Sequence, residues 1–214
     1  SRSLSSRQPR VYHAPGWPRG RRGVGGSAPV PSASMLTTEL LLAAYRHGCF
    51  PMAVDRRGTI GWFSPDPRAL IPLDDRFHVP HGLRRTLRKR PFEIEFDRDF
   101  DAVIRACAVS HGETWISPGI VRAYSRLHRD GHAHSVEARK DRQLVGGLYG
   151  VSIGGTFFGE SMFHRATDAS KVALVALVER LRSRGYALLD TQWMTPHLER
   201  FGAYEVPRSR YLRM

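Results

Sequence analysis

The stretch that decides the fold is HSVEARKDRQLVGGLYGVSIGGTFFGESMF, residues 134–163. It holds three runs rich in β-branched, aromatic and apolar residues, at 134–139, 144–153 and 156–163. A polar turn at Asp141 separates the first two runs, and the Gly154-Gly155 pair separates the last two. Short turns of this composition join antiparallel strands. The pattern therefore predicts a three-stranded β-meander.

Helical and strand patterns flank the meander on both sides. After it, apolar residues recur at helical spacing from a cap at Thr167 or Asp168 to Gly185, and YALLDTQW at 186–193 predicts a strand. Short elements are expected near 195–200, 203–206 and 208–213. Before the meander, strands are expected within 60–72 and at 92–96, and helices at 37–48, 83–90, 100–107 and 118–131. An α+β fold follows from this order of elements.

The chain is strongly basic. Its 33 Lys and Arg residues against 20 Asp and Glu give a net charge of +13 over 214 residues. Positive charge on this scale attracts polyanions, with nucleic acid as the first candidate and an anionic membrane as the second. The longest apolar run, 172–178, is too short to cross a bilayer. Two distant cysteines, Cys49 and Cys107, favour a reducing, cytoplasmic location over a disulfide-bonded secreted protein.

Composition divides the chain into three parts. Residues 1–34 hold seven Ser, five Gly, five Pro and six Arg, without Asp or Glu, which predicts a disordered or spurious leader before a start at Met35. Residues 35–91 are expected to form a small N-terminal domain. Residues 92–214 are expected to form the catalytic domain.

Candidate catalytic residues lie in two of the predicted strands. The two-residue period of a strand places Asp190 and Gln192 on one face. Glu160 follows Gly159, a glycine that lets a ligand or another backbone approach closely. Asp190 could instead cap a turn and Glu160 could pair with an arginine. Burying carboxylates in apolar strands is costly without a partner or purpose, which favours a functional site.

A basic stretch precedes the first long strand of the meander. No acid lies within residues 76–90, so the stretch predicts a phosphate-binding stripe, although a solvated face is the simpler alternative. Its cations are Arg76, Arg84, Arg85, Arg88, Lys89 and Arg90. His132 and His134 share a strand face, but no third ligand of suitable spacing accompanies them, so we expect no metal.

A helix between a β-meander and a further strand is typical of acetyl-CoA-dependent acyltransferases, which bind pyrophosphate at the helix N-terminus through a glycine-containing turn. The turn here is HRATDAS, which lacks the small residues and places Asp168 where an anion would bind. We therefore expect an acetyltransferase-like (GNAT-type) C-terminal domain without that cofactor.

Nine segments occur in order between about residues 36 and 212. They are AYRHGCFPM, WFSPDPRALIPL, GETWIS, GHAHSVE, LVGGLYGV, FFGESMF, ASKVAL, LLDTQW and FGAYEVPRSRYL. Together they resemble the leucyl/phenylalanyl-tRNA protein transferase family. The resemblance implies a cytoplasmic enzyme without a cofactor that moves Leu, Phe or Met from aminoacyl-tRNA to an N-terminal Arg or Lys of a protein. That transfer marks the protein for degradation by the N-end rule. We also expect a monomer.

The resemblance implies roles for the three polar residues. Asp190 is expected to orient Gln192, and Glu160 is expected to give, with Asp190, a negative spot for the cationic acceptor residue. An apolar pocket for the aminoacyl side chain is implied at Trp115, Leu148, Phe157 and Leu189.

The same resemblance leaves the binding of the terminal adenine open. Many family members carry a tryptophan where this chain has Met52, so either Met52 or Trp62 is expected to contact the adenine. Two alternative functions also stay open at this point. One is an acyl-CoA transferase of the same fold, and the other is a tRNA-binding module without catalysis.

Overall fold

The computed structural model describes residues 36–110 and 114–214. The helices are α1 Thr38–Arg46, α2 His81–Lys89, α3 Phe100–Val109, α4 Pro118–Arg129, α5 Ala169–Ser183, α6 Pro196–Glu199 and α7 Arg208–Tyr211. The strands are β1 Phe50–Ala53, β2 Ile60–Phe63, β3 Arg68–Ile71, β4 Glu93–Phe96, β5 Ala133–Lys140, β6 Gln143–Ile153, β7 Thr156–His164, β8 Leu188–Gln192 and β9 Tyr204–Val206. The predicted leader and the predicted start at Met35 lie outside the described residues.

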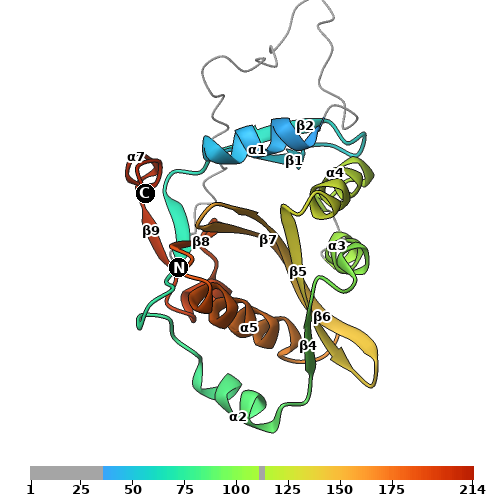
Figure 1. Ribbon diagram of the computed structural model, residues 1–214, viewed down its shortest axis with the longest axis vertical. Coiled ribbons are helices and arrows are strands. Elements are labelled where there is room, and N and C mark those ends of the chain that lie inside the picture. The colour runs from blue at the N-terminus through green and yellow to red at the C-terminus, as the bar shows by residue number, and fades with distance from the viewer. Residues whose placement is uncertain (1–35, 111–113) are drawn as a thin grey trace, which may run out of the picture.

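The β-meander and the helix after it form the centre of the molecule (Figure 1). In the described residues the main sheet has seven strands in the order β4-β5-β6-β7-β8-β3-β9. Strands β4 to β7 are antiparallel, and β7 pairs with β8 in parallel. A parallel pair needs a long crossover, and α5 supplies it. The α+β, acetyltransferase-like fold class and the meander are thus confirmed.

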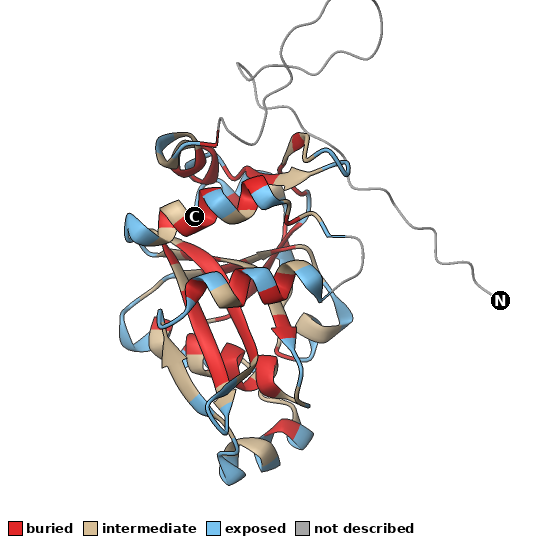
Figure 2. Ribbon diagram, turned by 90° about the vertical axis from the view of Figure 1, so that its right-hand side faces the viewer, coloured by how far each residue is buried: buried red, intermediate tan, exposed pale blue. Residues whose placement is uncertain are grey.

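Apolar side chains cover both faces of the sheet. Successive strand residues point to opposite faces, so Leu148 belongs to the core beneath α5 and α2, whereas Tyr149 belongs to the core beneath α1, α3 and α4. Figure 2 shows buried residues concentrated along the central strands and on the helix faces that pack against them. Two helix starts follow local chemistry, because Thr37 caps α1 through Leu40 N and Ser117 caps α4 through Ile120 N.

The N-terminal part of the chain is divided between two sheets. Strands β1 and β2 form their own antiparallel pair beside α1. In contrast, β3 lies in the main sheet between β8 and β9, and α2 contacts α5. The predicted domain division stays a prediction, and these pairings favour a boundary between β2 and β3 over one at residue 91.

Candidate active site

An opening in the main sheet creates the candidate site. The parallel pairing of β7 with β8 ends at Phe158 and Asp190. In the next part of β7, a register shift against β6 leaves Glu160 as the extra residue of a β-bulge between Gly159 and Ser161. Gly150 faces this bulge, and a Cβ there would lie 2.2 Å from the carbonyl oxygen of Phe158. The bulge therefore requires glycine at that position, and it turns Glu160 toward the gap between the strands.

A cavity of about 260 Å³ occupies this gap. Its apolar wall comes from both sides of the opening and from α5. The wall residues are Leu148, Met162, Leu174, Leu177, Leu189 and Leu198. The polar end comes from Glu160, Ser161, Thr191 and Gln192, and the Trp193 ring lies beside them. An apolar chamber with a few convergent polar groups is the usual form of a small-ligand site.

Glu160 is half-buried at the polar end and accepts two hydrogen bonds on Oε1. One comes from Tyr45 Oη at 2.7 Å and the other from Gln192 Nε2 at 3.0 Å. Tyr45 Oη also lies 2.5 Å from Tyr124 Oη. Burial raises the pKa of Glu160 to about 8, although the Tyr45 hydrogen bond opposes the rise. Glu160 can therefore gain or lose a proton near neutral pH.

Asp190 lies behind Gln192 and is fully buried. Arg68 donates Nε to Oδ1 at 2.9 Å and Nη2 to Oδ2 at 2.7 Å, so the two groups form a two-pronged ion pair. Tyr211 Oη donates to Oδ2 at 2.5 Å. The main-chain N–H of Gln192 donates to Oδ1 at 2.9 Å. The Asp190 carboxylate thus bonds to the main chain of Gln192, and the side-chain carboxamide of Gln192 bonds to Glu160.

The structure brings together part of the predicted site. Asp190, Gln192 and Glu160 are joined as described above, and Leu148 and Leu189 line the cavity. Phe157 is buried and lines a separate cavity with His134 and Arg184. Trp115 lines a surface hollow beside Asp55 and Ser117. The predicted roles of these two aromatic residues have no support from the cavity geometry.

Met52 and Trp62 lie outside the cavity, in the β1–β2 hairpin. Both are partly buried against the core beneath α1. The hairpin reaches the cavity through Phe50, whose ring meets the edge of Trp193 at a centroid distance of 5.1 Å. Adenine contact by Met52 or Trp62 stays a prediction.

Sequence reasoning missed four residues of the site: Arg68, Tyr211, Tyr45 and Trp193. One signal was present for Arg68, because a cation inside the apolar strand RALI needs a buried counter-charge. Tyr45 lies on the buried face of α1, and its hydroxyl donates to Glu160. The contact of Tyr211 with Asp190 has no local signal, since it depends on where α7 docks.

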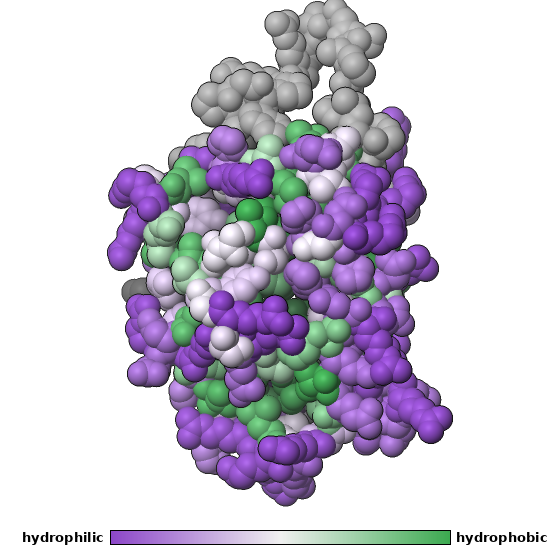
Figure 3. Space-filling model, viewed as in Figure 1, coloured by the Kyte–Doolittle hydropathy of each residue, from purple (hydrophilic) through white to green (hydrophobic). Residues whose placement is uncertain are grey.

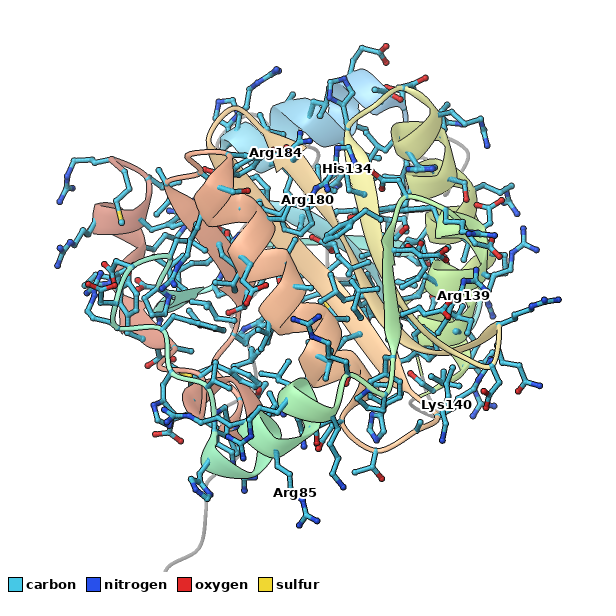
Figure 4. The ribbon with its side chains drawn as sticks, turned by 60° about the horizontal axis from the view of Figure 1, so that its bottom comes forward. Arg85, His134, Arg139, Lys140, Arg180 and Arg184 are labelled. Carbon is cyan, nitrogen blue, oxygen red and sulfur yellow. The ribbon has the colours of Figure 1, made fainter. Side chains whose placement is uncertain are left out.

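The predicted phosphate-binding stripe divides into two parts. The five cations of 84–90 are exposed on or next to α2, and Figure 4 shows Arg85 projecting away from the helix. Arg76 instead pairs with Asp74, with Nη2 at 2.7 Å from Oδ2. Hydrogen bonds from Arg76 lower the pKa of Asp74 to about 2. Asp74 therefore neutralises Arg76, whereas the segment that carries the other five cations contains no acidic residue.

A larger hollow lies between α2, β4 and α5. Figure 3 shows hydrophobic residues near this lower part of the molecule, among hydrophilic ones. The lining includes Leu87, Phe92, Ile94 and Val172, with Glu179 and Arg180 at its edge. The smaller cavity is the candidate active site because the Glu160 carboxylate and the Gln192 carboxamide meet at its polar end.

The N-terminus of α5 bears on the acyl-CoA alternative. Asp168 occupies the N-cap with a φ of 68°, and its carboxylate accepts hydrogen bonds from Thr86 Oγ1 and Lys171 Nζ, at 2.9 and 2.7 Å. A carboxylate at this end of the helix repels a second anion such as pyrophosphate. This geometry disfavours CoA binding in the manner typical of acetyltransferases.

Metal-binding clusters and membrane-spanning helices are both absent from the described ranges, 36–110 and 114–214. No group of three or more His, Cys, Asp or Glu side chains there is placed to hold a metal ion. None of the helices in the same ranges has the length and apolar character needed to cross a membrane.

Comparison with known proteins places the chain among tRNA-dependent transferases. The family model described as leucyl/phenylalanyl-tRNA protein transferase matches residues 70–214, and the model of its N-terminal domain matches residues 34–66. The leucyl/phenylalanyl-tRNA–protein transferase of Akkermansia muciniphila is 58% identical over 181 residues, which cover 84% of this chain and 94% of that protein. The protein of the same name from Herpetosiphon aurantiacus is 56% identical, with coverage of 84% and 92%.

The similarity to solved structures is weaker than the similarity to these relatives. A ribosomal-protein-alanine N-acetyltransferase from Brucella melitensis aligns at 18% identity with a TM-score of 0.36, over 46% of this chain and 76% of that chain. The topology described above, and not this alignment, supports the fold class.

Proposed function

The chain belongs to the leucyl/phenylalanyl-tRNA protein transferase family, and we propose that Glu160 and Gln192 act on the acceptor amine at the polar end of its cavity. It is an aminoacyltransferase that moves Leu or Phe from aminoacyl-tRNA to an acceptor protein, which thereby gains an N-end rule degradation signal. The observation that carries the proposed mechanism is the carboxylate and carboxamide pair at the end of an apolar chamber.

The aminoacyl side chain occupies the apolar part of the cavity in this proposal. The wall of leucine and methionine side chains offers contacts to Leu or Phe and also to Met, the third amino acid we propose. A side chain branched at Cβ places bulk next to the ester, where the cavity meets its polar end. We therefore expect Ile and Val to be transferred poorly.

The acceptor amine approaches Glu160. Its nitrogen attacks the ester carbonyl carbon, the new peptide bond forms, and the bond to the ribose oxygen of the tRNA breaks. The amine loses one proton and the ribose oxygen gains one. Ionised Glu160 can take the amine proton, since its pKa of about 8 is close to the working pH, and Gln192 holds that carboxylate in place. Asp190 acts from behind as a positioning group, because its two oxygens already accept bonds from Arg68, Tyr211 and Gln192.

The acceptor residue that we propose is an N-terminal Arg or Lys. Free Glu160 is mostly protonated near neutral pH, but a cation at the polar end favours its ionised form and lowers its pKa, so the pair attract each other within an otherwise basic protein. We further propose that the enzyme acts as a monomer in the cytoplasm, where aminoacyl-tRNA is made.

The exposed cations of α2 are the tRNA-binding surface in this proposal. Arg84, Arg85, Arg88, Lys89 and Arg90 offer a row of donors for the phosphate backbone. Arg180 of α5 lines the same hollow as Arg90 and adds positive charge there, whereas Figure 4 shows Arg184 near His134, away from Arg85. Arg76 contributes less, because Asp74 neutralises it.

The test is incorporation of labelled Leu from Leu-tRNA into two peptides that differ only in an N-terminal Arg or Ala. Label on the Arg peptide alone supports the proposed acceptor rule, and equal label on both contradicts it. Glu160→Gln should abolish most transfer while tRNA binding persists. Glu179→Gln, on the exposed side of α5, is the matched control and should transfer normally. Binding of tRNA without transfer by the parent enzyme would instead favour the binding-module alternative.

A further inference from the structure

Arg68 joins four separate parts of the chain at one buried point. Its side chain is 1% exposed. The guanidinium lies between two rings, 5.3 Å from the centroid of Phe50 and 4.7 Å from that of Tyr211. Besides the two-pronged pair with Asp190, Nη1 donates to the carbonyl oxygen of Gly48 at 2.9 Å. The group thus contacts the turn after α1, strand β1, the catalytic strand β8 and the C-terminal helix α7.

Helix α7 is held firmly enough to fix the Tyr211 hydroxyl. At its start, Arg208 donates Nε to Ser64 Oγ at 2.6 Å and its main-chain N–H to Asp66 Oδ1 at 3.0 Å. At its end, α7 lies close against Gly48, where a Cβ would stand 2.8 Å from the side chain of Leu212. Gly48 also has a φ of +70°, which favours glycine. These contacts place Tyr211 Oη 2.5 Å from Asp190 Oδ2.

The backbone of Gln192 depends on the same carboxylate. Its φ of +62° is a left-handed conformation that non-glycine residues rarely adopt. Such a conformation persists where the surroundings impose it, and it often occurs at functional sites. Two contacts bear on this conformation: the bond from Gln192 N–H to Asp190 Oδ1, and the pairing of Gln192 with Ala69 beside a register shift between β3 and β8. In this conformation the carboxamide reaches Glu160 across the gap between β7 and β8.

We propose that Arg68 and Tyr211 are positioning residues for the transfer reaction, and that they act by holding Asp190 so that it keeps Gln192 in its left-handed conformation beside Glu160. The inference rests on the proposed function, in which Gln192 and Glu160 meet the acceptor amine. It assigns to the C-terminal helix a role in the chemistry, although neither Tyr211 nor Arg68 lines the cavity.

Burial of an ion pair alone does not explain this arrangement. A buried pair is often replaceable by apolar side chains without loss of stability. Here the partners are directional: the guanidinium meets both carboxylate oxygens, and the tyrosine hydroxyl adds a short bond to one of them. Directional contacts orient the carboxylate, and its orientation determines where the Gln192 N–H bond can form.

The first test is Tyr211→Phe, which removes one hydroxyl and keeps the ring against Arg68. The matched control is Tyr186→Phe, which removes a hydroxyl that lies 2.6 Å from Ser152 Oγ. We expect Tyr211→Phe to lower kcat about tenfold, the loss appropriate to one hydrogen bond to a charged group. The KM for aminoacyl-tRNA should stay within the range of the control, and the enzyme should stay folded at the assay temperature with a melting temperature only a few degrees lower.

The second test follows the Gln192 backbone directly and needs no activity. Hydrogen exchange at the Gln192 amide, measured in the folded protein, should be about tenfold faster in Tyr211→Phe than in the parent and unchanged in Tyr186→Phe. Arg68→Lys keeps the positive charge but loses the fork, so it should show the same exchange phenotype in a folded protein.

Either of two results would overturn the inference. One is a Tyr211→Phe enzyme with unchanged kcat and unchanged Gln192 exchange. The other is a loss of activity that matches the loss of folded protein, since that indicates a purely structural role. Failure of the proposed function looks different: the parent enzyme would transfer no label to the Arg peptide, while the exchange result would still decide whether Tyr211 holds Gln192.

Discussion

Replacement of Glu160 by Gln tests the electrostatics of the site through protein stability. Burial raises the pKa of Glu160 from 4.5 to about 8. The folded protein therefore holds this proton up to about pH 8, whereas the unfolded chain releases it near pH 4.5. The stabilisation linked to this proton is fully present below pH 4.5, decreases as the pH rises toward 8, and is lost above that value. Gln cannot titrate, so the variant lacks this dependence.

The size of the effect follows from the two pKa values. At 1.36 kcal/mol per pKa unit, the change from 4.5 to about 8 corresponds to about 5 kcal/mol as a ceiling. Glu160 is half-buried and borders the cavity, so water screens part of this energy. We expect roughly half, about 2–3 kcal/mol, to appear between pH 5 and pH 9. The variant should gain stability relative to the parent by that amount as the pH rises.

Urea unfolding at one-unit steps from pH 5 to pH 9 measures the difference in free energy of unfolding between the parent and Glu160→Gln. Groups unaffected by the substitution cancel in this difference. Glu179→Gln removes an exposed glutamate of α5 and is the control for the loss of a carboxylate as such. A Glu160→Gln difference that stays constant within about 0.5 kcal/mol over the whole range would refute the reasoning.

Three further predictions concern the ion pair, the tRNA surface and the cavity. Asp190→Asn should lower the free energy of unfolding, measured in urea, by about 3–5 kcal/mol, because buried Arg68 loses its counter-charge. Adding Arg68→Met should restore most of the stability but not the activity. An Asp190→Asn protein as stable as the parent would contradict this. Leu174→Phe should narrow the cavity and reduce kcat/KM for Phe transfer about tenfold more than for Leu, and equal losses would argue against this pocket. Charge reversal on α2 should weaken tRNA binding and reduce the slope of log K against log salt by about 0.7–0.9 for each phosphate that the protein no longer neutralises, whereas unchanged binding would identify a solvated face. The residues to reverse are Arg84, Arg85 and Arg88.

The sequence was sufficient for most of the elements, although not for strand β1, and it named Asp190, Gln192 and Glu160 as candidate site residues. Strand alternation predicts that Asp190 and Gln192 share one face. The structure instead joins them through the Gln192 backbone N–H, and the left-handed conformation of Gln192 lets its side chain border the cavity with Leu189 and Thr191. The close approach expected at Gly159 is not seen, because a Cβ there would lie 3.6 Å from its nearest neighbour, the Asp190 carbonyl oxygen; the crowded glycine is Gly150, opposite the bulge. The predicted elements hold because they depend on period and turn chemistry within a few residues of the chain, whereas the roles of the site residues stay predictions.

Only two of the four residues predicted for the apolar pocket line the cavity. Leu148 and Leu189 line the cavity, but Phe157 borders a different cavity and Trp115 lies at a surface hollow. Apolar character identifies a residue as buried, but it does not say which cavity its side chain borders. That depends on how β7 and β8 diverge, and the divergence is a property of the whole sheet.

By itself the sequence determined the meander, the crossover helix and the acids and amide of the site, since local patterns encode each of them. Only the tertiary structure decided that β3 lies beside β8, so that Arg68 meets Asp190 across 122 positions of sequence, and that Tyr45 meets Glu160 across 115. Tyr211 joins them because α7 docks against the turn at Gly48. The physical reason is that a segment's conformation follows from its own side chains, whereas the partners of a buried charge are chosen by the packing of distant segments.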